Sequence, residues 1–373
     1  MAFLKFLEGI RNPFFDWLFS LITLIGDETV FLVIALVVFW CVSKKDGYYL
    51  LFVGFFGQII NNFLKLIFRI PRPFVIDKTL TTVGNVEERA LGYSFPSGHT
   101  QNIGGTLGTV AARSKKLFVR IVCIVVILLV GFSRMYLGVH TPLDVFVSLG
   151  IAALLVLALY PMFKTEERFE KFMPYLVLAA ILFSLAYMLY FPIFKNVSHD
   201  SDNLRSALEF AYMFAGCTMG LAVVYFVDTS IAKFDTRAPW YMQLVKLTLG
   251  FGIVIAIKEG LDAPLVFICG GKELIARMVR YFLIVSFAGA VWPLTFKFFA
   301  KCKCAPLDNF GKKVGSLFKK RDTDATQEAN EPVFDAPKKA KGAKKSKEEE
   351  KPLYPEKKKR KQSWRAARKN KFK

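Results

Sequence analysis

Residues that bind metals or transfer protons near neutral pH are scarce in this sequence. Its 373 residues include only three His and six Cys. The cysteines lack the paired spacing of a metal site, and most lie within or beside apolar runs, where a thiol usually serves as inert packing. No cluster of carboxylates suited to magnesium accompanies the polar motifs described below. We therefore predict that the protein uses neither a metal nor another cofactor.

Acidic residues are also few, and the positive charge is unevenly distributed. The chain has 51 Lys and Arg against 30 Asp and Glu, a formal net charge of +21. Residues 302–373 alone hold 23 Lys and Arg against 10 Asp and Glu, a surplus of 13. More than half of the net charge belongs to one segment, so the high charge does not indicate a nucleic-acid-binding protein as a whole.

That basic segment has the composition of a disordered tail. From about residue 308 it is poor in apolar residues and alternates lysine runs with the acidic run 348–350. Three roles fit it: attraction to anionic lipid headgroups, at about 1 kcal/mol per cation near the surface, contact with nucleic acid or ribosomes, or enforcement of topology. We favour association with anionic lipid.

What the sequence has in excess is apolar surface. Hydrophobic residues make up 54% of the chain, and 38 residues are Phe. Several continuous runs reach the roughly 20 residues that a helix needs to cross a bilayer, and they lack the alternation of a barrel strand. We predict an all-α polytopic membrane helix bundle with about nine transmembrane helices. Their expected positions are 28–43, 47–70, 99–113, 116–136, 142–163, 174–194, 206–227, 240–260 and 279–300.

Two further expectations follow from these runs. The third span is short and contains Gly104, Gly105 and Gly108, so it should be wedged between other helices, because small residues let helices pack closely in lipid. Three cationic groups fall on one side by span counting: 44–45, 113–116 and 164–171. The positive-inside rule then puts the tail in the cytoplasm and the N-terminus outside. Four segments should face outward: 71–98, 137–141, 195–205 and 261–278.

The first polar motif disobeys this charge rule. Lys65 and Arg72 lie at the outer end of the second span, seven residues apart and so on one helical face. Pro71 and Pro73 end the helix at this point. Two long cations directed at one place suit an anionic group with several oxygens, since Arg can bind two oxygens at once. Taken alone, the pair fits cations that snorkel at a helix end equally well.

The second motif is Pro96-Ser97-Gly98-His99, at the expected start of the third span. A turn that opens a helix presents free backbone N–H groups and a hydroxyl, which together form an anion site. Gly98 lets the backbone approach an anion closely, and His99 can exchange a proton near neutral pH. Taken alone, the motif fits equally a capped helix whose histidine has no function.

The third motif joins Ser133-Arg134 to His140 and Asp144. His140 and Asp144 are four residues apart, on one face of a helix. A carboxylate behind a histidine fixes its tautomer and leaves the other ring nitrogen free to attack. The alternative is a polar corner between two helices. By span counting all three motifs reach the same, outer side.

Other polar residues within the expected spans have two interpretations each. Gln58, Asn61 and Asn62 either hold helices together or line a pocket below Lys65, and we favour the first. Glu209, within the seventh span, either marks a path for ions or headgroups, or forms a buried ion pair or lies at the interface. The sequence does not decide this second case.

The three motifs together resemble a known signature. The patterns KxxxxxxRP, PSGH and SRxxxxxHxxxD occur in that order, without a mismatch, over residues 65–144. They are the tripartite signature of the type 2 phosphatidic acid phosphatase superfamily. That superfamily includes lipid phosphate phosphatases, undecaprenyl diphosphate phosphatases, sphingosine-1-phosphate phosphatases, glucose-6-phosphatase and vanadate-dependent haloperoxidases.

The resemblance implies a role for each matching residue. The residues implied to bind phosphate are Lys65, Arg72, Ser97, Gly98 and Arg134. His140 is implied to be the nucleophile that forms phospho-histidine, and Asp144 to orient it. His99 is implied to protonate the leaving oxygen and then to activate water. The implied reaction is metal-independent hydrolysis of a phosphoric monoester or diphosphate.

The expected spans, the motifs and the basic tail together divide the chain into parts. We expect an N-terminal interfacial segment (1–27), a phosphatase core with five spans (28–163), four additional transmembrane helices (164–301) and the disordered basic cytoplasmic tail (302–373). The expected partners are the bilayer and a lipid phosphate or isoprenoid diphosphate substrate such as undecaprenyl diphosphate. The expected location is a bacterial plasma membrane, with the active site outside. The alternatives are a phosphatase for a small soluble ester, as in glucose-6-phosphatase, or a non-enzymatic transporter or scaffold.

Overall fold

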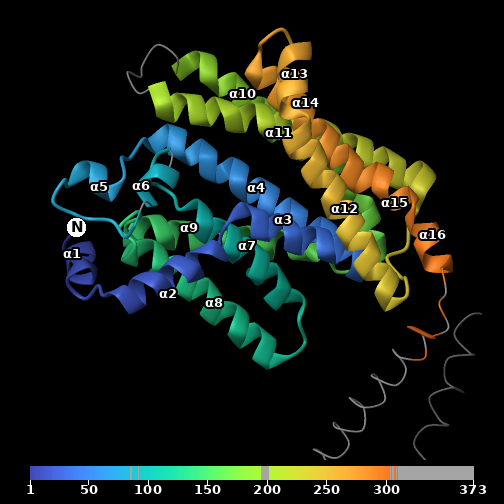
Figure 1. Cartoon of the computed structure of the whole chain (residues 1–373), viewed down its shortest axis with the longest axis horizontal. Helices are drawn as coiled ribbons and strands as arrows, with labels where there is room; N and C mark the ends of the chain where they lie inside the picture. The colour runs from blue at the N-terminus through green and yellow to red at the C-terminus, as the bar shows by residue number, and fades with distance from the viewer. Residues whose placement is uncertain are drawn as a thin grey trace, which may run out of the picture. The chain divides into compact units, whose positions relative to one another are not determined.

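The computed structural model describes residues 1–84, 86–90, 92–194, 201–302, 304, 306–307 and 309. Within this part of the chain all regular structure is helical (Figure 1), which confirms the predicted fold class. The predicted disordered tail lies almost wholly outside the described residues, so that expectation stays a prediction.

The helices fall into three groups along the chain. The N-terminal group is α1 (Ala2–Gly9), α2 (Pro13–Leu24), α3 (Glu28–Val37) and the π-helical turn η1 (Val38–Val42). The middle group is α4 (Lys44–Phe68), α5 (Pro73–Ile76), α6 (Val86–Arg89), α7 (Gly98–Arg113), α8 (Leu117–Tyr136), α9 (Pro142–Leu159) and η2 (Tyr160–Phe163). The last group is α10 (Glu166–Phe194), α11 (Ser201–Val227), η3 (Asp228–Ala232), α12 (Trp240–Gly260), α13 (Asp262–Ile268), α14 (Glu273–Ser286), η4 (Phe287–Val291), α15 (Trp292–Leu294) and α16 (Phe296–Lys301).

Polar side chains mark several helix starts. Each of these residues accepts a hydrogen bond from a free backbone N–H in the first turn of the helix that follows it: Asn12, Asp27, Ser43, Ser97 and Thr141. Pro follows the cap directly in α2 and α9, where its missing N–H has no cost. Helix boundaries near the motifs are therefore local properties of the sequence.

Seven helical stretches in the described part are long and apolar enough to cross a membrane. An eighth arises if α2 and the α3–η1 helix count as one span bent by 47°. The expected number was about nine, and the difference is α7. This helix has 16 residues, and its first turns carry the buried polar side chains of Thr100, Gln101 and Asn102. It is therefore too short and too polar to span by itself.

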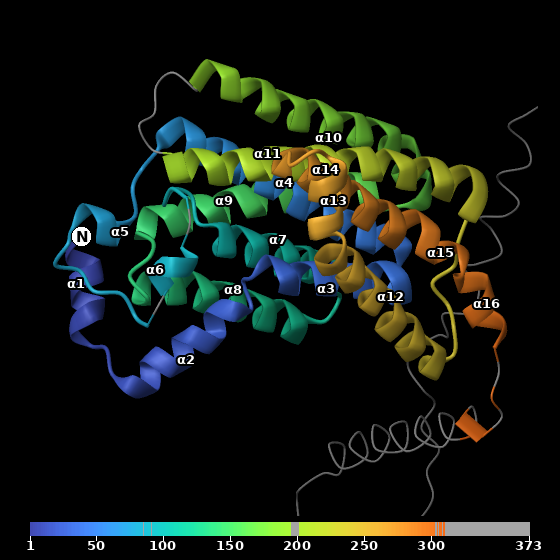
Figure 2. The same ribbon diagram turned by 45° about the horizontal axis from the view of Figure 1, so that its top comes forward.

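Helix α7 lies inside the bundle, as its glycines predicted. It packs against α4, α8 and α9 (Figure 2). A Cβ atom added at Gly104 would lie 2.9 Å from the Cβ of Ala152, and one at Gly105 would lie 3.1 Å from Val53 Cγ1. The close approach of these helices thus requires small residues on α7.

Ion pairs join the helix ends farthest from the motifs. Arg113 at the end of α7 contacts Asp46 at the start of α4 at 2.6 Å. Lys45 pairs with Glu166 of α10 at 2.9 Å, and Lys44 pairs with Asp228 of η3 at 3.0 Å. The cationic loops that set the predicted orientation therefore gather at one end of the bundle. Lys65 is at the opposite end of the 25-residue helix α4.

The last group of helices packs directly on the middle group. One hydrophobic cluster contains Tyr49 and Phe52 of α4, Val177 of α10 and Trp292 of α15. Helices α10 and α11 both contact α4 (Figure 1). Glu209 of α11 pairs with Arg205 of its own helix and with Arg277 of α14. This outcome favours the ion-pair interpretation of Glu209.

The N-terminal helices are held by polar contacts to the segment after α5. Lys5 of α1 pairs with Asp77 at 3.0 Å, and Glu8 accepts a hydrogen bond from the backbone N–H of Thr81 at 2.9 Å. The hydrogen bonds from Thr81 hold the pKa of Glu8 below its usual value. The placement of residues 1–27 at a membrane interface stays a prediction.

Candidate active site

The three motifs meet where several helices begin or end. Lys65 is in the last turn of α4, and the helix is capped by Arg69, whose φ of 48° ends the helical path before Pro71. Arg72 immediately precedes α5, and His99 is the second residue of α7. The third motif runs from the end of α8, which carries Arg134, to the start of α9, which carries Asp144.

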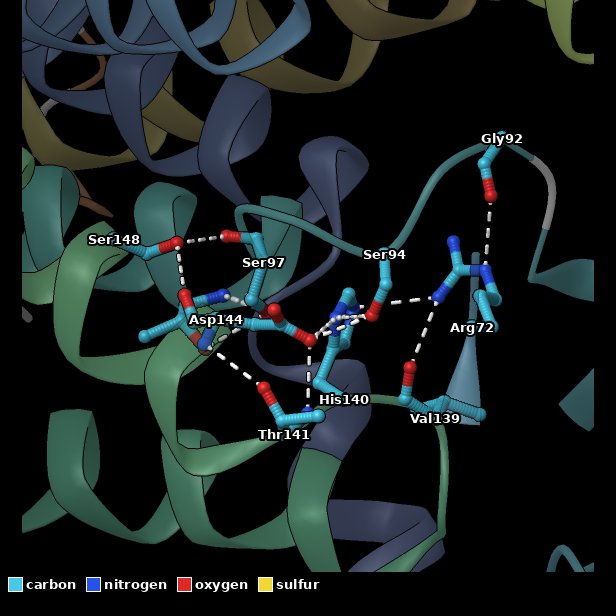
Figure 3. A network of polar contacts seen from close by, with 10 residues as sticks. Arg72, Gly92, Ser94, Ser97, Val139, His140, Thr141, Asp144 and Ser148 are labelled. Atoms are coloured by element: carbon cyan, nitrogen blue, oxygen red, sulfur yellow. Dashed lines mark hydrogen bonds and ion pairs between the residues drawn. The ribbon is translucent and has the colours of Figure 1, made fainter. Parts of the chain in front are cut away.

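The centre of the cluster is the pair of His140 and Asp144 (Figure 3). The Nδ1 of His140 lies 3.3 Å from Oδ2 of Asp144, and both side chains are 2% exposed. The same oxygen accepts a hydrogen bond from the backbone N–H of Thr141 at 2.8 Å, as part of a capping box. Asp144 is thus fixed by the start of its own helix before it contacts the ring. Burial lowers the pKa of His140, which favours the neutral ring.

The other ring nitrogen of His140 faces Arg72. The Nη1 of Arg72 lies 3.4 Å from Nε2 of His140 and 3.3 Å from the carbonyl oxygen of Val139 (Figure 3). Its Nε donates to the carbonyl oxygen of Gly92 at 3.1 Å. If Nδ1 carries the proton that Asp144 accepts, Nε2 has a lone pair directed to the side where Arg72 lies.

The start of α7 is held against the start of α9. The backbone N–H of Ser97 donates to the carbonyl oxygen of Asp144 at 3.2 Å. Ser148 donates to the carbonyl oxygens of Ser97 and Asp144, at 2.9 and 2.8 Å. A Cβ atom added at Gly98 would meet nothing within 4 Å, so open space adjoins the backbone there. An anion could approach the helix N-terminus through that space.

Three cations lie near the His140–Asp144 pair. Lys65 is half-buried and interacts electrostatically with Arg72 and Arg134. The Nη1 of Arg134 donates to Thr23 Oγ1 at 2.8 Å, while its buried Nε has no hydrogen-bond partner among the described residues. His99 interacts electrostatically with His140 and with all three cations. The structure therefore brings the charged and titratable residues of the three motifs together, whereas the hydroxyl of Ser133 donates to the carbonyl oxygen of Val130 in its own helix.

Some residues beside the cluster were not expected from the sequence. The hydroxyl of Ser94 donates to Oδ2 of Asp144 at 2.6 Å and lies 3.4 Å from Nδ1 of His140. The only sequence signal that could have pointed to it is its position three residues before Ser97. A pocket of about 30 Å³ beside Lys65 is lined partly by Asn203 and Ser206 of α11. No local pattern linked α11 to this place.

No group of three or more His, Cys, Asp or Glu side chains that could hold a metal ion occurs in the part of the chain described. The only acidic side chain among the residues predicted for the site is Asp144, whose Oδ2 is occupied by hydrogen bonds. The predicted independence of metals is a statement about the reaction and stays a prediction.

Cations and a helix N-terminus thus lie near a buried His–Asp pair at one end of a membrane-type helix bundle, and groups of this kind suit an anion with several oxygens. Comparison with known families agrees with a site of this kind. Residues 46–168 match the PAP2 superfamily, and residues 212–303 match the transmembrane extension of PAP2 superfamily phosphatases. The chain thus contains a PAP2 superfamily domain followed by that extension, which confirms the resemblance found in the motifs.

Individual relatives cover parts of this arrangement. The chain is 34% identical over 113 residues to undecaprenyl-diphosphatase BcrC of Bacillus subtilis, which is 30% of this chain and 55% of that protein. It is 26% identical over 230 residues to a probable sphingosine-1-phosphate phosphatase of Dictyostelium discoideum, 58% of this chain and 54% of that protein. The chain therefore spans little more than half the length of each. Among solved structures, the chain is similar to the crystal structure of Aquifex aeolicus LpxE, with 24% sequence identity and a TM-score of 0.38. The match covers 42% of this chain and 92% of that one.

Proposed function

We propose that this protein is an integral membrane phosphatase that hydrolyses a lipid phosphate or isoprenoid diphosphate through a phospho-histidine intermediate. One observation carries the proposal. His140 has its Nδ1 beside Asp144 and its Nε2 beside Arg72, within a cluster that also holds Lys65 and Arg134. A nucleophile oriented by a carboxylate, next to groups that bind anionic oxygens, is what phosphoryl transfer needs.

In the first step Nε2 of His140 attacks phosphorus, and the bond from phosphorus to the ester oxygen breaks. Lys65, Arg72 and Arg134 neutralise charge on the transferred phosphoryl group, together with the backbone amides at the start of α7. Asp144 stabilises the ring as it becomes positively charged. His99 donates the proton that the leaving oxygen takes.

In the second step His99, now neutral, accepts a proton from water. The oxygen of that water attacks phosphorus, the P–N bond to His140 breaks, and inorganic phosphate leaves. Both histidines then regain their starting protonation states. His99 lies in the first turn of α7 and His140 just before α9, and the hydrogen bond from Ser97 to Asp144 holds these two helix starts together, which supports this alternation.

A lipid substrate is supported by the position of the site at the ends of membrane-type helices and by relatives named as phosphatases of lipid-linked phosphates. Isoprenoid diphosphates such as undecaprenyl diphosphate are our first choice. A glucose-6-phosphatase-like enzyme for a soluble ester is the second enzymatic candidate. A transporter or scaffold is the non-enzymatic alternative, and the complete set of motif residues speaks against it.

The proposal includes an orientation. The cationic helix ends lie on the cytoplasmic side of a bacterial plasma membrane, with the basic tail there to attract anionic lipid headgroups. The site then faces outward. The separation of the ion pairs at Lys44, Lys45 and Arg113 from Lys65 along α4 supports this arrangement.

The first test is phosphate release by the purified protein in the presence of EDTA. The substrates are an isoprenoid diphosphate, phosphatidic acid, sphingosine phosphate and glucose 6-phosphate. We expect release from at least one lipid, with His140→Ala reduced to background and His199→Ala, the histidine outside the motifs, unchanged. An acid-labile phosphoryl group trapped on the wild-type protein and absent from His140→Ala would establish the intermediate. Equal release by both proteins would contradict the mechanism.

A further inference from the structure

A second feature of the bundle is a cavity of about 200 Å³ between α3, α4, α7, α11 and α14. Its wall is formed mainly by apolar side chains, among them Phe31, Phe55, Phe214 and Ile284. The two core helices α4 and α7 form one side, and α11 and α14 of the transmembrane extension form the other. The cavity therefore exists only because the extension packs on the core.

The cavity lies in line with the candidate active site. On α4 the lining residues Gln58, Gly54 and Leu51 precede Lys65 by 7, 11 and 14 residues, so all four share one helical face. At 1.5 Å per residue these positions are about 10 to 20 Å deeper in the bundle than Lys65. On α7 the lining residue Asn102 follows His99 by three residues, which is one turn.

The end nearest the site is polar: Glu28, Gln58 and Asn102 line it, and the amides of Gln58 and Asn102 are paired with each other. The amide of Gln58 donates to the side-chain oxygen of Asn102, which links α4 to α7. Asn102 also donates to the carbonyl oxygen of Gly26. This outcome confirms that Gln58 holds helices together, and it shows that the same residue lines a pocket. Below this pair a sugar or a second phosphate would find few groups with which to form hydrogen bonds.

We infer that this cavity receives the hydrocarbon chain of the phosphate ester whose headgroup binds at His140. The inference rests on the proposed function, and it names how the substrate is chosen. A chain attached to a phosphate beside Lys65 and His99 would extend past Gln58 and Asn102 into an apolar space bounded by Phe31 and Phe214. Because the chain leaves a bilayer that is equally apolar, the cavity selects by shape and length.

Cys217 of α11 lines the cavity, so replacing it by a large side chain would fill part of the space. The experiment measures kcat/KM for phosphate release from alkyl phosphates of increasing chain length in detergent. For the wild type we expect kcat/KM to rise with chain length. For Cys217→Trp we expect kcat/KM to fall at least about tenfold below that of the wild type on the longest chains and to equal it on the shortest. Met219→Trp, which places the same bulk on an exposed position of the same helix, should behave like the wild type.

A binding measurement separates this inference from the chemistry. In His140→Ala, which does not turn over substrate, a long-chain alkyl phosphate should slow the reaction of Cys217 with an apolar thiol reagent at least about fivefold, and a short-chain one should not. Protection without any phosphate release from the wild type would uphold the cavity and refute the proposed function. The inference would be overturned if Cys217→Trp lowered kcat/KM equally at all chain lengths, or at none. It would also be overturned if the rate of Cys217 labelling did not depend on the chain length of the alkyl phosphate.

Discussion

At the residue scale, the carboxylate of Asp144 is held by more than its motif implies. One oxygen, Oδ2, accepts hydrogen bonds from the backbone of Thr141 and from the hydroxyl of Ser94, and it also contacts the ring of His140. A carboxylate with several donors stays ionised and keeps its direction. Ser94 is therefore a positioning residue for the proposed nucleophile.

We predict that Ser94→Ala lowers kcat by roughly 10- to 100-fold, since a hydrogen bond to a charged group contributes about 1.5–3 kcal/mol. The backbone N–H of Thr141 still holds Asp144, so the protein should remain folded. Ser184→Ala removes an equally buried hydroxyl from α10 and should leave kcat unchanged. The test measures kcat of both variants on the preferred substrate, and thermal unfolding checks that both are folded. Equal kcat values for the two variants would show that Ser94 does not position the proposed nucleophile.

At the element scale, glycines decide how closely the extension helices pack. A Cβ atom added at Gly216 of α11 would lie 2.1 Å from the backbone carbonyl oxygen of Met278 on α14. Backbone cannot move aside as a flexible side chain can. Gly220, one turn further along α11, likewise approaches Val285 of α14, where a Cβ atom would lie 2.8 Å from the Val285 Cβ. The contact between α11 and α14, which forms one side of the apolar cavity, thus requires glycine at these positions, most strictly at Gly216.

We predict that Gly216→Ala destabilises the folded protein by about 1–3 kcal/mol, the usual cost of overpacking. Gly252 of α12 is the matched control, because a Cβ atom there would meet nothing within 4 Å. Gly252→Ala should be neutral or stabilising by up to about 1 kcal/mol, since Ala favours a helix. Thermal unfolding in detergent would compare the two, and a lower midpoint for Gly252→Ala than for Gly216→Ala would refute the packing argument.

At the scale of the whole molecule, the cationic loops with their ion pairs and the candidate site lie at opposite ends of the bundle. The loop between α7 and α8 belongs to the cationic end, next to the ion pair of Arg113 with Asp46. The segment after α5 belongs to the end that carries Arg72 and His140. A membrane around the apolar helices would separate these two ends.

This separation predicts which positions react from outside a cell. In a background without native cysteines, Lys78→Cys should react with a membrane-impermeant maleimide in intact cells. Lys115→Cys should react only after permeabilisation. Both side chains are exposed in the structure, so accessibility within the protein does not distinguish them. The reverse pattern would show that the site faces the cytoplasm.

What the sequence determined by itself is the class of fold and the members of the candidate site. Apolar runs longer than a bilayer is thick must become helices, because lipid offers no hydrogen bonds to a backbone. Caps and prolines are local, so the ends of helices that carry Lys65, Arg72 and Ser97 were readable from the chain. The spacing of His140 and Asp144 put both on one face before any packing was known.

The tertiary structure alone decided what lies beside these residues. The contact of Ser94 with Asp144, the pairing of Thr23 with Arg134 and the approach of α11 to Lys65 join segments far apart in sequence. Packing also made α7 a buried helix and left an apolar cavity between core and extension. Such features depend on which faces meet, and helical periodicity identifies a face without identifying its partner.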